Sequence, residues 1–469
     1  MNYMGNNVCS SLVPWIAWHE YTVNGEVKTL VYEQRTHWYY LLTNGAADSW
    51  RSLIKENPGN SKYYELLHTM YEDGVIIASS HIAVLGSSDK DYVKKFQRIP
   101  EDFHAELKKE GYIFDAHWDI TNKCNERCIH CYNTGAHTGL RNIQTNELSL
   151  DEAKELVDEL HFLGVFRLVL SGGEVLTKDY FIPLCEHIRE HGLQLIIYTN
   201  GLAFTDALLN KLSRIYPATV CLSVYGDSEN IHDSITRVKG SYKKSLHVLS
   251  YLREHNIETC HKNTLLTQNY SCWKETLRKG ESLANRSLIN CTIYPSMDNG
   301  ALSKYSLTES QLIDLALSPD SPIYFKRRTK GACNIDKDPS ETPCYNKTNT
   351  IYINPTGEVC LCIAFPCVIA RLREGNIRQL KRNGKFSIFE TDFSKLSGIE
   401  RLDNWRSLRI TDLKDCGHHD YCEYCIDVCP GDAFLLKGDM LSAPDNHCII
   451  AKARQKAYQM SGQLKNNGQ

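Results

Sequence analysis

The spacing of apolar residues differs from one segment of the chain to the next. Between residues 112 and 325, short apolar runs alternate with segments whose apolar residues recur every three to four positions. The runs predict strands over 113–121, 166–170, 193–199, 218–224, 258–266 and 288–294. The amphipathic segments predict helices over 151–162, 181–191, 206–215, 242–255 and 273–284. Alternating strands and helices predict the α/β class, with a parallel sheet or barrel.

The region before residue 105 follows another pattern. From Trp15 to Glu33, two alternating segments flank Asn24-Gly25, which is typical of a hairpin with a type I′ turn. Further elements are predicted as a strand over 37–42 and short helices over 48–55 and 61–72. Residues 1–105 therefore predict a small α+β module, and the simplest role for it is a cap that packs on the core.

Composition is ordinary for a soluble globular protein, with 42% hydrophobic and 23% charged residues. The formal charge of −3 gives no electrostatic case for nucleic acid as a partner. No stretch approaches the roughly 18 apolar residues that a membrane-spanning helix needs. The first residues lack the basic segment of a signal peptide, so we expect a cytoplasmic protein without a membrane partner.

Cysteine usage changes this picture. Ten of the 19 cysteines lie between Cys333 and Cys448, and disulfides are unusual in a reducing compartment. Such a density is typical of metal sites. Residues 326–450 therefore predict a loop-rich metal-binding region, and residues 451–469 a short, helix-prone tail that frays.

Three further cysteines, Cys124, Cys128 and Cys131, form a CxxxCxxC loop after the first core strand. A cubic [4Fe–4S] cluster normally takes four cysteine ligands, so three thiolates leave one iron open to another ligand. Zinc sites pair their cysteines as CxxC…CxxC, which this loop does not do. The spacing favours a cluster with an open iron.

With Tyr132 directly after the third cysteine, this loop resembles the radical S-adenosylmethionine (SAM) superfamily. The resemblance implies that SAM fills the open iron position and that the reduced cluster cleaves it to a 5′-deoxyadenosyl radical. It also implies that residues 106–325 form a partial (β/α)6 TIM-like barrel, whose chemistry lies at the carboxyl ends of the strands.

Four segments after the following strands match the superfamily's SAM-binding motifs. Gly172-Gly173-Glu174 resembles the motif that binds the methionine amino group, since glycines allow close approach and a carboxylate pairs with an ammonium. Thr199-Asn200 resembles a segment near SAM. Ser223, and Arg237 in the loop before the next helix, occupy the places of residues that contact the ribose and carboxylate of SAM. A strand-end hydroxyl and a surface ion pair are the simpler alternatives for these two residues.

The C-terminal cysteines resemble the SPASM extension of radical SAM enzymes. Cys344, Gly357 and Cys362 match the first half of its pattern. The resemblance implies two auxiliary [4Fe–4S] clusters, one on Cys333, Cys344, Cys362 and Cys429, the other on Cys416, Cys422, Cys425 and Cys448. Three clusters and SAM are therefore the expected cofactors.

Two ligand positions stay open. Cys360 competes with Cys362, and His419 occupies the place of the SPASM pattern's second cysteine in that group, with Cys422 three residues later. We favour Cys422, although imidazole binds iron in Rieske centres. Zinc is the alternative metal for this region, because it also accepts four thiolates.

SPASM enzymes typically oxidise ribosomally made peptides. Residues 1–105 resemble their winged-helix peptide-recognition element, which captures a leader peptide as an extra strand. The resemblance implies a maturase that installs a thioether, carbon–carbon or ether crosslink in a precursor peptide, with electrons from a flavodoxin or ferredoxin. The alternatives are a peptide epimerase, a sulfatase-type maturase and a non-enzymatic iron–sulfur electron-transfer protein. Sulfatase-type maturases carry an Asp where Ile363 stands here.

Overall fold

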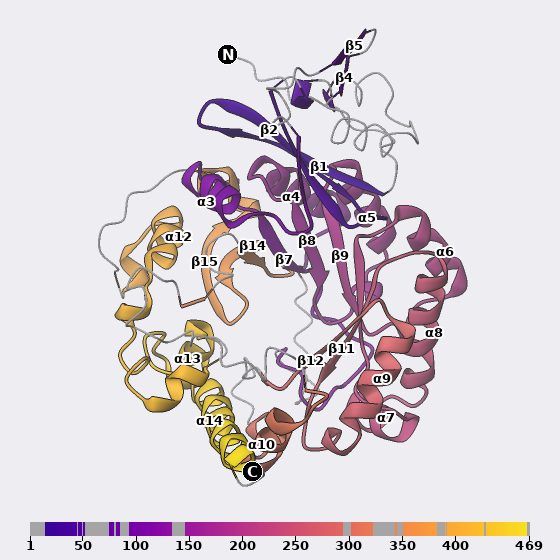
Figure 1. Cartoon of the computed structure of the whole chain (residues 1–469). Helices are drawn as coiled ribbons and strands as arrows, with labels where there is room; N and C mark the ends of the chain where they lie inside the picture. Colours follow the sequence, from indigo (N-terminus) through magenta and orange to yellow (C-terminus); the bar gives the residue numbers. More distant parts are fainter. Residues whose placement is uncertain are drawn as a thin grey trace.

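A computed structural model of the chain describes residues 15–44, 46–48, 50–51, 75–78, 81–84, 93–133, 146–293, 302–321, 343–344, 350–381, 390, 392–425 and 428–466. Its centre is a nine-stranded sheet in the order β12-β11-β10-β9-β8-β7-β13-β14-β15. Figure 1 shows this sheet as one wall of an open ring, and the C-terminal segments form the other side.

Six strands of this sheet are parallel and follow one another in chain order. They are β7 (Asp115–Asp119), β8 (Arg167–Ser171), β9 (Gln194–Thr199), β10 (Thr219–Ser223), β11 (Thr259–Thr264) and β12 (Arg286–Asn290). The predicted α/β class and its six strands are confirmed, and β12 begins two residues earlier than predicted.

The sheet continues beyond the predicted boundary between residues 325 and 326. Strand β13 (Thr350–Ile353) pairs in parallel with β7, and β14 (Glu358–Cys362) and β15 (Phe365–Arg371) follow as antiparallel strands. The cysteine-rich region is therefore built partly on the barrel sheet and is less loop-rich than expected. This pairing joins residues more than 200 positions apart, so no local pattern predicts it.

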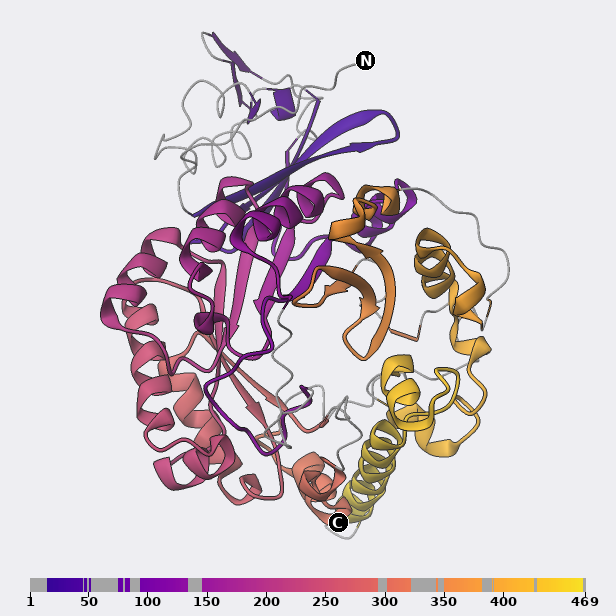
Figure 2. The same ribbon diagram turned by 180° about the vertical axis from the view of Figure 1, so that it is seen from behind.

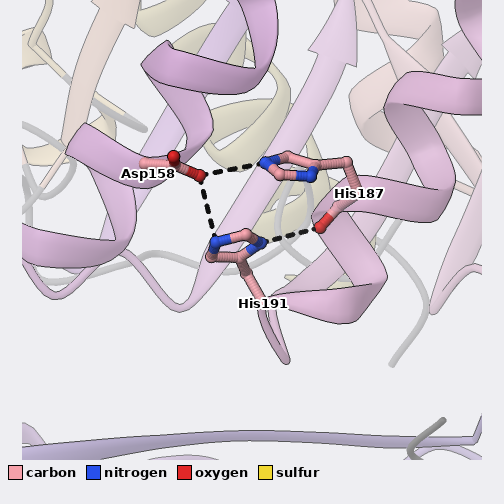
Figure 3. A group of neighbouring side chains, drawn as sticks. All are labelled: Asp158, His187 and His191. Atoms are coloured by element: carbon pink, nitrogen blue, oxygen red, sulfur yellow. Dashed lines mark hydrogen bonds and ion pairs between the residues drawn. The ribbon is translucent and has the colours of Figure 1, made fainter. Parts of the chain in front are cut away.

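Helices cover the outer face of the parallel strands (Figures 1 and 2). They are α4 (Leu150–Phe162), α5 (Phe181–Glu190), α6 (Asp206–Ile215), α7 (Glu229–Thr236), α8 (Ser241–Glu254) and α9 (Trp273–Leu283). Five were predicted, whereas α7 was expected as a loop because two turns are too short to show a helical period. On the outer surface, Asp158 of α4 faces His187 of α5 and His191, which caps the end of α5 (Figure 3).

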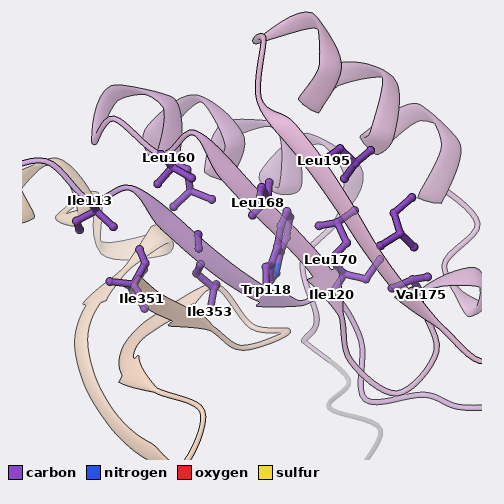
Figure 4. Packing of buried hydrophobic residues seen from close by; sticks show 14 of the residues in the cluster. Ile113, Trp118, Ile120, Leu160, Leu168, Leu170, Val175, Leu195, Ile351 and Ile353 are labelled. Carbon is purple, nitrogen blue, oxygen red and sulfur yellow. The ribbon is translucent and has the colours of Figure 1, made fainter. Parts of the chain in front are cut away.

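Alternation along the strands separates a core face from a cavity face. In β7, Ala116 and Trp118 are buried against the helices, whereas His117 faces a cavity on the other side. Figure 4 shows Trp118 packed with Leu168 and Leu170, and Ile353 of β13 nearby. The barrel and the C-terminal strands thus share one hydrophobic core.

The N-terminal module is an antiparallel sheet in the order β1-β2-β3-β6. Its strands are β1 (Ile16–Val23), β2 (Glu26–Glu33), β3 (Trp38–Thr43) and β6 (Val93–Phe96). Asn24 and Gly25 have φ of 51° and 83°, as the predicted type I′ turn requires. The predicted helix 61–72 and most of 48–55 lie outside the described residues, so the winged-helix assignment stays a prediction.

This module packs on the amino ends of the barrel strands. Tyr21 is buried with Phe103 of α3 (Glu101–Lys109), and its hydroxyl donates to the Gly164 carbonyl at 3.0 Å. The Trp18 amide donates to the Gly192 carbonyl at 2.9 Å. Gly164 and Gly192 lie just before β8 and β9, so the module sits at the opposite end of these strands from their carboxyl termini.

The predicted fraying tail is instead the second part of a long helix. Helix α14 (Asp445–Asn466) crosses the expected boundary at residue 450. Ile450 and Ala453 are buried against Leu312 of α10 (Glu309–Leu317), and Lys456 pairs with Glu309 at 2.7 Å. This contact closes the ring in Figures 1 and 2. Within the described part of the chain, no helix has the length and apolarity needed to cross a membrane.

Candidate active site

A cavity of about 560 Å³ opens at the carboxyl ends of the parallel strands. Of the residues that the sequence assigned to the first cluster and SAM, its walls contain Cys124, Cys128, Cys131, Tyr132, Gly172, Gly173, Thr199, Asn200 and Ser223. Four segments that are distant in sequence thus meet at the place where barrel enzymes carry their chemistry.

The loop with the three cysteines is held by the end of helix α7. The amides of Arg127 and Ile129 donate to the carbonyls of Thr236 and Ile235, both at 3.0 Å. These bonds fix the backbone on either side of Cys128. The helix that the sequence did not predict therefore positions the central cysteine.

The charges in this loop fit a bound cation. Burial, followed by the neighbouring Glu126 and Cys131, raises the pKa of Cys128 well above its usual value. The Cys128 thiol donates to the Glu126 carboxylate at 3.3 Å, and burial raises the pKa of Glu126 to about 8. Thiolates and a buried carboxylate are stable together when a metal supplies positive charge. Three thiols on one cavity wall are the donor set for an iron–sulfur cluster with one open position.

The Gly172-Gly173 turn packs directly on the backbone that leads into this loop. The amides of Gly173 and Glu174 donate to the carbonyls of Thr121 and Lys123, both at 2.7 Å. A Cβ atom on Gly172 would lie 2.3 Å from the Thr121 carbonyl oxygen, and one on Gly173 would lie 2.1 Å from that of Lys123. Only glycine allows this approach.

Glu174 points away from the cavity in this structure. Its carboxylate is buried and accepts hydrogen bonds from the Thr199 hydroxyl at 2.6 Å and the Asn200 amide at 2.7 Å. Burial raises its pKa, and these bonds oppose the shift. Glu174 thus holds the end of β9 in place, and its contact with the SAM amino group stays a prediction.

Arg237, like Glu174, is a candidate SAM contact that does not line the cavity. It ends α7 in the left-handed conformation, with φ of 59°, and its side chain is exposed. Ser223, in contrast, ends β10 and lines the cavity. The backbone beside Arg237 holds the cysteine loop, as described above for Thr236.

The cavity floor contains polar residues that sequence reasoning missed. The Tyr352 hydroxyl donates to Asp119 Oδ2 at 2.8 Å, and His117 Nε2 lies 3.3 Å from Asp119 Oδ1. The Lys262 ammonium lies 3.8 Å from the centre of the Tyr198 ring. Strict alternation places His117 and Lys262 on the cavity face, which was a usable signal. No sequence signal identified Tyr352, because its place in the cavity depends on the pairing of β13 with β7, which are far apart in the chain.

Cysteines expected for the first auxiliary cluster lie near one another. Burial raises the pKa of Cys429, and the nearby Cys362 and Cys344 raise it further. Burial raises the pKa of Cys362 to about 11. Cys362 lines the large cavity and Cys360 does not, which favours Cys362 as the ligand. Cys333 lies outside the described residues.

The four cysteines expected for the second auxiliary cluster surround one small cavity: Cys416, Cys422, Cys425 and Cys448. Burial raises the pKa of Cys448 to about 12, with contributions from the other three. His419 also touches this cavity, but it is exposed and stacks on Tyr421 with ring centres 4.9 Å apart. Cys422 is buried, and this favours it over His419.

Comparison with known proteins supports this description. Residues 118–280 match the family model of the radical SAM superfamily. An AdoMet-dependent heme synthase of Methanosarcina barkeri is 23% identical over 360 residues, which cover 72% of this chain and 97% of that protein. The antilisterial bacteriocin subtilosin biosynthesis protein AlbA of Bacillus subtilis is 21% identical, covering 80% of this chain and 78% of AlbA. The mycofactocin maturase MftC of Mycolicibacterium smegmatis is 29% identical over 29% of this chain and 33% of MftC.

Solved structures share the fold at low identity. Streptococcus suis SuiB bound to its precursor peptide SuiA has a TM-score of 0.52 and 15% identity, covering 93% of this chain and 99% of SuiB. Native anSMEcpe with bound AdoMet has a TM-score of 0.54 and 15% identity, covering 76% of this chain and all of the other, 100%. The chain therefore carries a radical SAM domain, which includes residues 118–280.

Proposed function

We propose that this protein is a radical SAM peptide maturase. It removes a hydrogen atom from a ribosomally made precursor peptide and installs an intramolecular thioether, carbon–carbon or ether crosslink. The observation that carries the proposal is the cavity, whose wall joins the Cys124 loop to Cys344 and Cys362. One space thus reaches both the predicted SAM cluster and the first predicted auxiliary cluster.

In this proposal Cys124, Cys128 and Cys131 hold the [4Fe–4S] cluster. Gly172, Gly173, Thr199, Asn200 and Ser223 surround SAM. When bound, the cluster and SAM supply the radical that abstracts hydrogen from an unactivated carbon. The protein orients the substrate in the cavity and excludes water.

The cavity floor offers a proton acceptor. Oxidation of the substrate to a crosslink releases protons as well as electrons. His117 faces the cavity, and its Nε2 lies 3.3 Å from the buried carboxylate of Asp119, which orients the ring for proton transfer. Burial raises the pKa of Tyr352, so its hydroxyl stays protonated and donates to Asp119. We assign His117 as the acceptor.

In the proposed enzyme, two auxiliary clusters would accept the electrons that oxidation of the substrate releases. Cys333, Cys344, Cys362 and Cys429 hold the first, and Cys416, Cys422, Cys425 and Cys448 hold the second. A flavodoxin or ferredoxin in the cytoplasm reduces the SAM cluster. Cys362 of the first group ends β14 of the central sheet, and Cys448 of the second lies on α14, on the C-terminal side of the ring (Figure 1).

The N-terminal sheet fits the capture of a leader peptide. Its described strands end in β1 on one side and β6 on the other, and an extended peptide can add to such an edge. The β1 edge already bonds to the barrel through Trp18. Strand β6 is therefore the proposed docking edge. The fold shared with SuiB, solved with its precursor peptide, supports this role.

A tetrapyrrole is the second candidate substrate. The alignment with the M. barkeri heme synthase spans 97% of that protein, so its whole length has a counterpart here. That alignment leaves 28% of this chain without a counterpart, and capture of a leader peptide needs an element in addition to the barrel. We therefore rank the peptide first.

The test is the intact mass of a short peptide encoded beside the gene, after anaerobic incubation with SAM, reductant and the protein. A loss of about two hydrogens per event is expected, and fragmentation then locates the bond. Iron coproporphyrin III serves as the parallel substrate. An unchanged peptide mass together with formation of 5′-deoxyadenosine would contradict crosslinking and favour epimerisation. Oxidation of the porphyrin but not of the peptide would establish a tetrapyrrole as the substrate.

A further inference from the structure

A second group of metal-binding side chains lies on the outside of the barrel, away from the cavity. Asp158 of α4, His187 of α5 and His191, which caps α5, converge there, and their ligand atoms lie within 4.8 Å of one another. Figure 3 shows both imidazoles directed at the same carboxylate. The two histidines are four residues apart at the end of one helix, so they share a face.

The distances are close to those of a metal centre. Asp158 Oδ1 lies 2.9 Å from His187 Nε2 and 3.0 Å from His191 Nε2. Zinc bonds of about 2.0–2.2 Å would separate neighbouring ligand atoms in a tetrahedron by about 3.3–3.5 Å. The carboxylate would therefore move a few tenths of an ångström from each imidazole to admit the ion, and the two imidazole nitrogens lie within 4.8 Å of each other.

The remaining contacts of His191 fit a metal ligand. His191 Nδ1 lies 3.0 Å from the carbonyl oxygen of His187, which can only accept a hydrogen bond. Its Nε2 faces Asp158 Oδ1, and the His187 ring, with its centre 4.4 Å away, presents Nε2 to the same oxygen. Two imidazole nitrogens and one carboxylate oxygen therefore converge on one point.

A divalent ion would bind where these three atoms converge. Both Nε2 atoms then offer their lone pairs to the metal, and the carboxylate binds it as an anion. The Nδ1–H of His191 stays on the His187 carbonyl, which is the usual outer hydrogen bond of a metal-bound histidine. Imidazole nitrogen with one carboxylate is a donor set that suits Zn²⁺.

We propose that Asp158, His187 and His191 bind one Zn²⁺ ion, with water at the remaining position. The side chains of His187 and His191 are 17% and 22% exposed, and that of Asp158 is 49% exposed, so an ion has access from solvent. This site is independent of the radical chemistry and of the proposed function.

The position of the site gives the ion a structural role. It joins α4 to the end of α5, and the next residue, Gly192, bonds to Trp18 of the N-terminal module. The His161 ring packs between those of His191 and His19, with ring centres 5.5 and 4.6 Å apart. Zinc binding would therefore stiffen the junction between the barrel and the module.

The test is metal analysis of the full-length protein, isolated anaerobically with its iron and dialysed against micromolar Zn²⁺. H187A/H191A is expected to hold one zinc per chain fewer than wild type, with equal iron. D158N, which keeps the side-chain shape, should weaken zinc binding at least tenfold. Zinc should raise the thermal midpoint of wild type by a few degrees and leave that of H187A/H191A unchanged.

The matched control is H247A. His247 pairs with Asp206 at 3.1 Å between α8 and α6, an exposed pair without a second histidine. Its zinc content should equal that of wild type, which separates the site from general binding by surface histidines and from the thiols. Equal zinc in wild type and H187A/H191A, or anomalous scattering that places no zinc at Asp158, would overturn the proposal and leave a metal-free ion pair.

Discussion

At the scale of single residues, burial controls the charge of the groups that would do chemistry. Cys128 and Glu126 keep their protons in the metal-free loop because both are buried side by side. Cluster assembly must therefore release protons from this loop, and it should proceed faster as pH rises.

Replacing Cys124, Cys128 and Cys131 with Ala should abolish SAM cleavage, because no other thiols of the described cavity wall lie in this loop. Iron bound by the C-terminal cysteines should remain. The measurements are 5′-deoxyadenosine formation and iron content. Persistent 5′-deoxyadenosine would refute the assignment of the SAM cluster.

His232 makes the stability of the site depend on pH. Burial lowers its pKa to about 4, and its Nδ1 accepts the Tyr225 amide at 3.0 Å. The unfolded chain binds this proton near pH 6.5, so stability is present above that pH and falls as pH drops toward 4. Between pH 6.5 and 5 the loss should be about 2 kcal/mol.

The variant H232N keeps an acceptor for Tyr225 but does not titrate. Urea unfolding from pH 5 to 6.5 should show a shallower slope of unfolding free energy against pH than in wild type. Parallel slopes would mean that His232 is protonated equally in both states.

At the scale of elements, the turn after β8 works through its backbone. G172A or G173A would force a Cβ atom against the Thr121 or Lys123 carbonyl. We expect at least a tenfold loss of SAM affinity and destabilisation by about 3 kcal/mol, from overpacking of the backbone. Isothermal titration with SAM measures the affinity, and denaturant unfolding measures the loss of stability.

G240A is the control for this pair. Gly240 also has positive φ, 83°, but a Cβ atom there would meet nothing within 4 Å. The G240A substitution should lower the free energy of unfolding by about 1 kcal/mol and leave the SAM affinity unchanged. An equal loss of affinity in G240A would mean that strain anywhere in the barrel, and not the close contact, is responsible.

Elements were predictable from sequence wherever their pattern was local. The core strands and long helices have regular apolar periods, and the Asn24-Gly25 turn needs positive φ. Helix α7 has only eight residues, so its period was invisible, and Arg237 was therefore assigned to a loop. Glu174 and Tyr352 depend on contacts between separate loops and strands. The cysteine spacing located the site, but it could not show which side chains complete its walls.

At the scale of the whole molecule, the ring is closed by α14 against α10. A453D would place a carboxylate among Leu312, Leu315 and Ile450. Burying this charge should cost about 2–4 kcal/mol and reduce the iron bound near Cys448, which lies on the same helix. Denaturant unfolding and iron analysis measure both effects.

K456A tests the rim of the same contact. Its partner Glu309 is half exposed, so loss of this pair should change stability by less than about 1 kcal/mol. If A453D were as mild as K456A, the buried contact between α10 and α14 would not hold the ring closed.

The N-terminal sheet covers the amino ends of the barrel strands, and the cavity opens at their carboxyl ends. A strand of five residues, such as β8, is about 17 Å long. A peptide docked on the sheet would have to span at least this distance, which takes about six extended residues. Under the proposed function, the molecule therefore sets a minimum spacing between the leader and the residue that is modified. Precursors with shorter spacers should bind with unchanged affinity, and their mass should be the same after the reaction as before it.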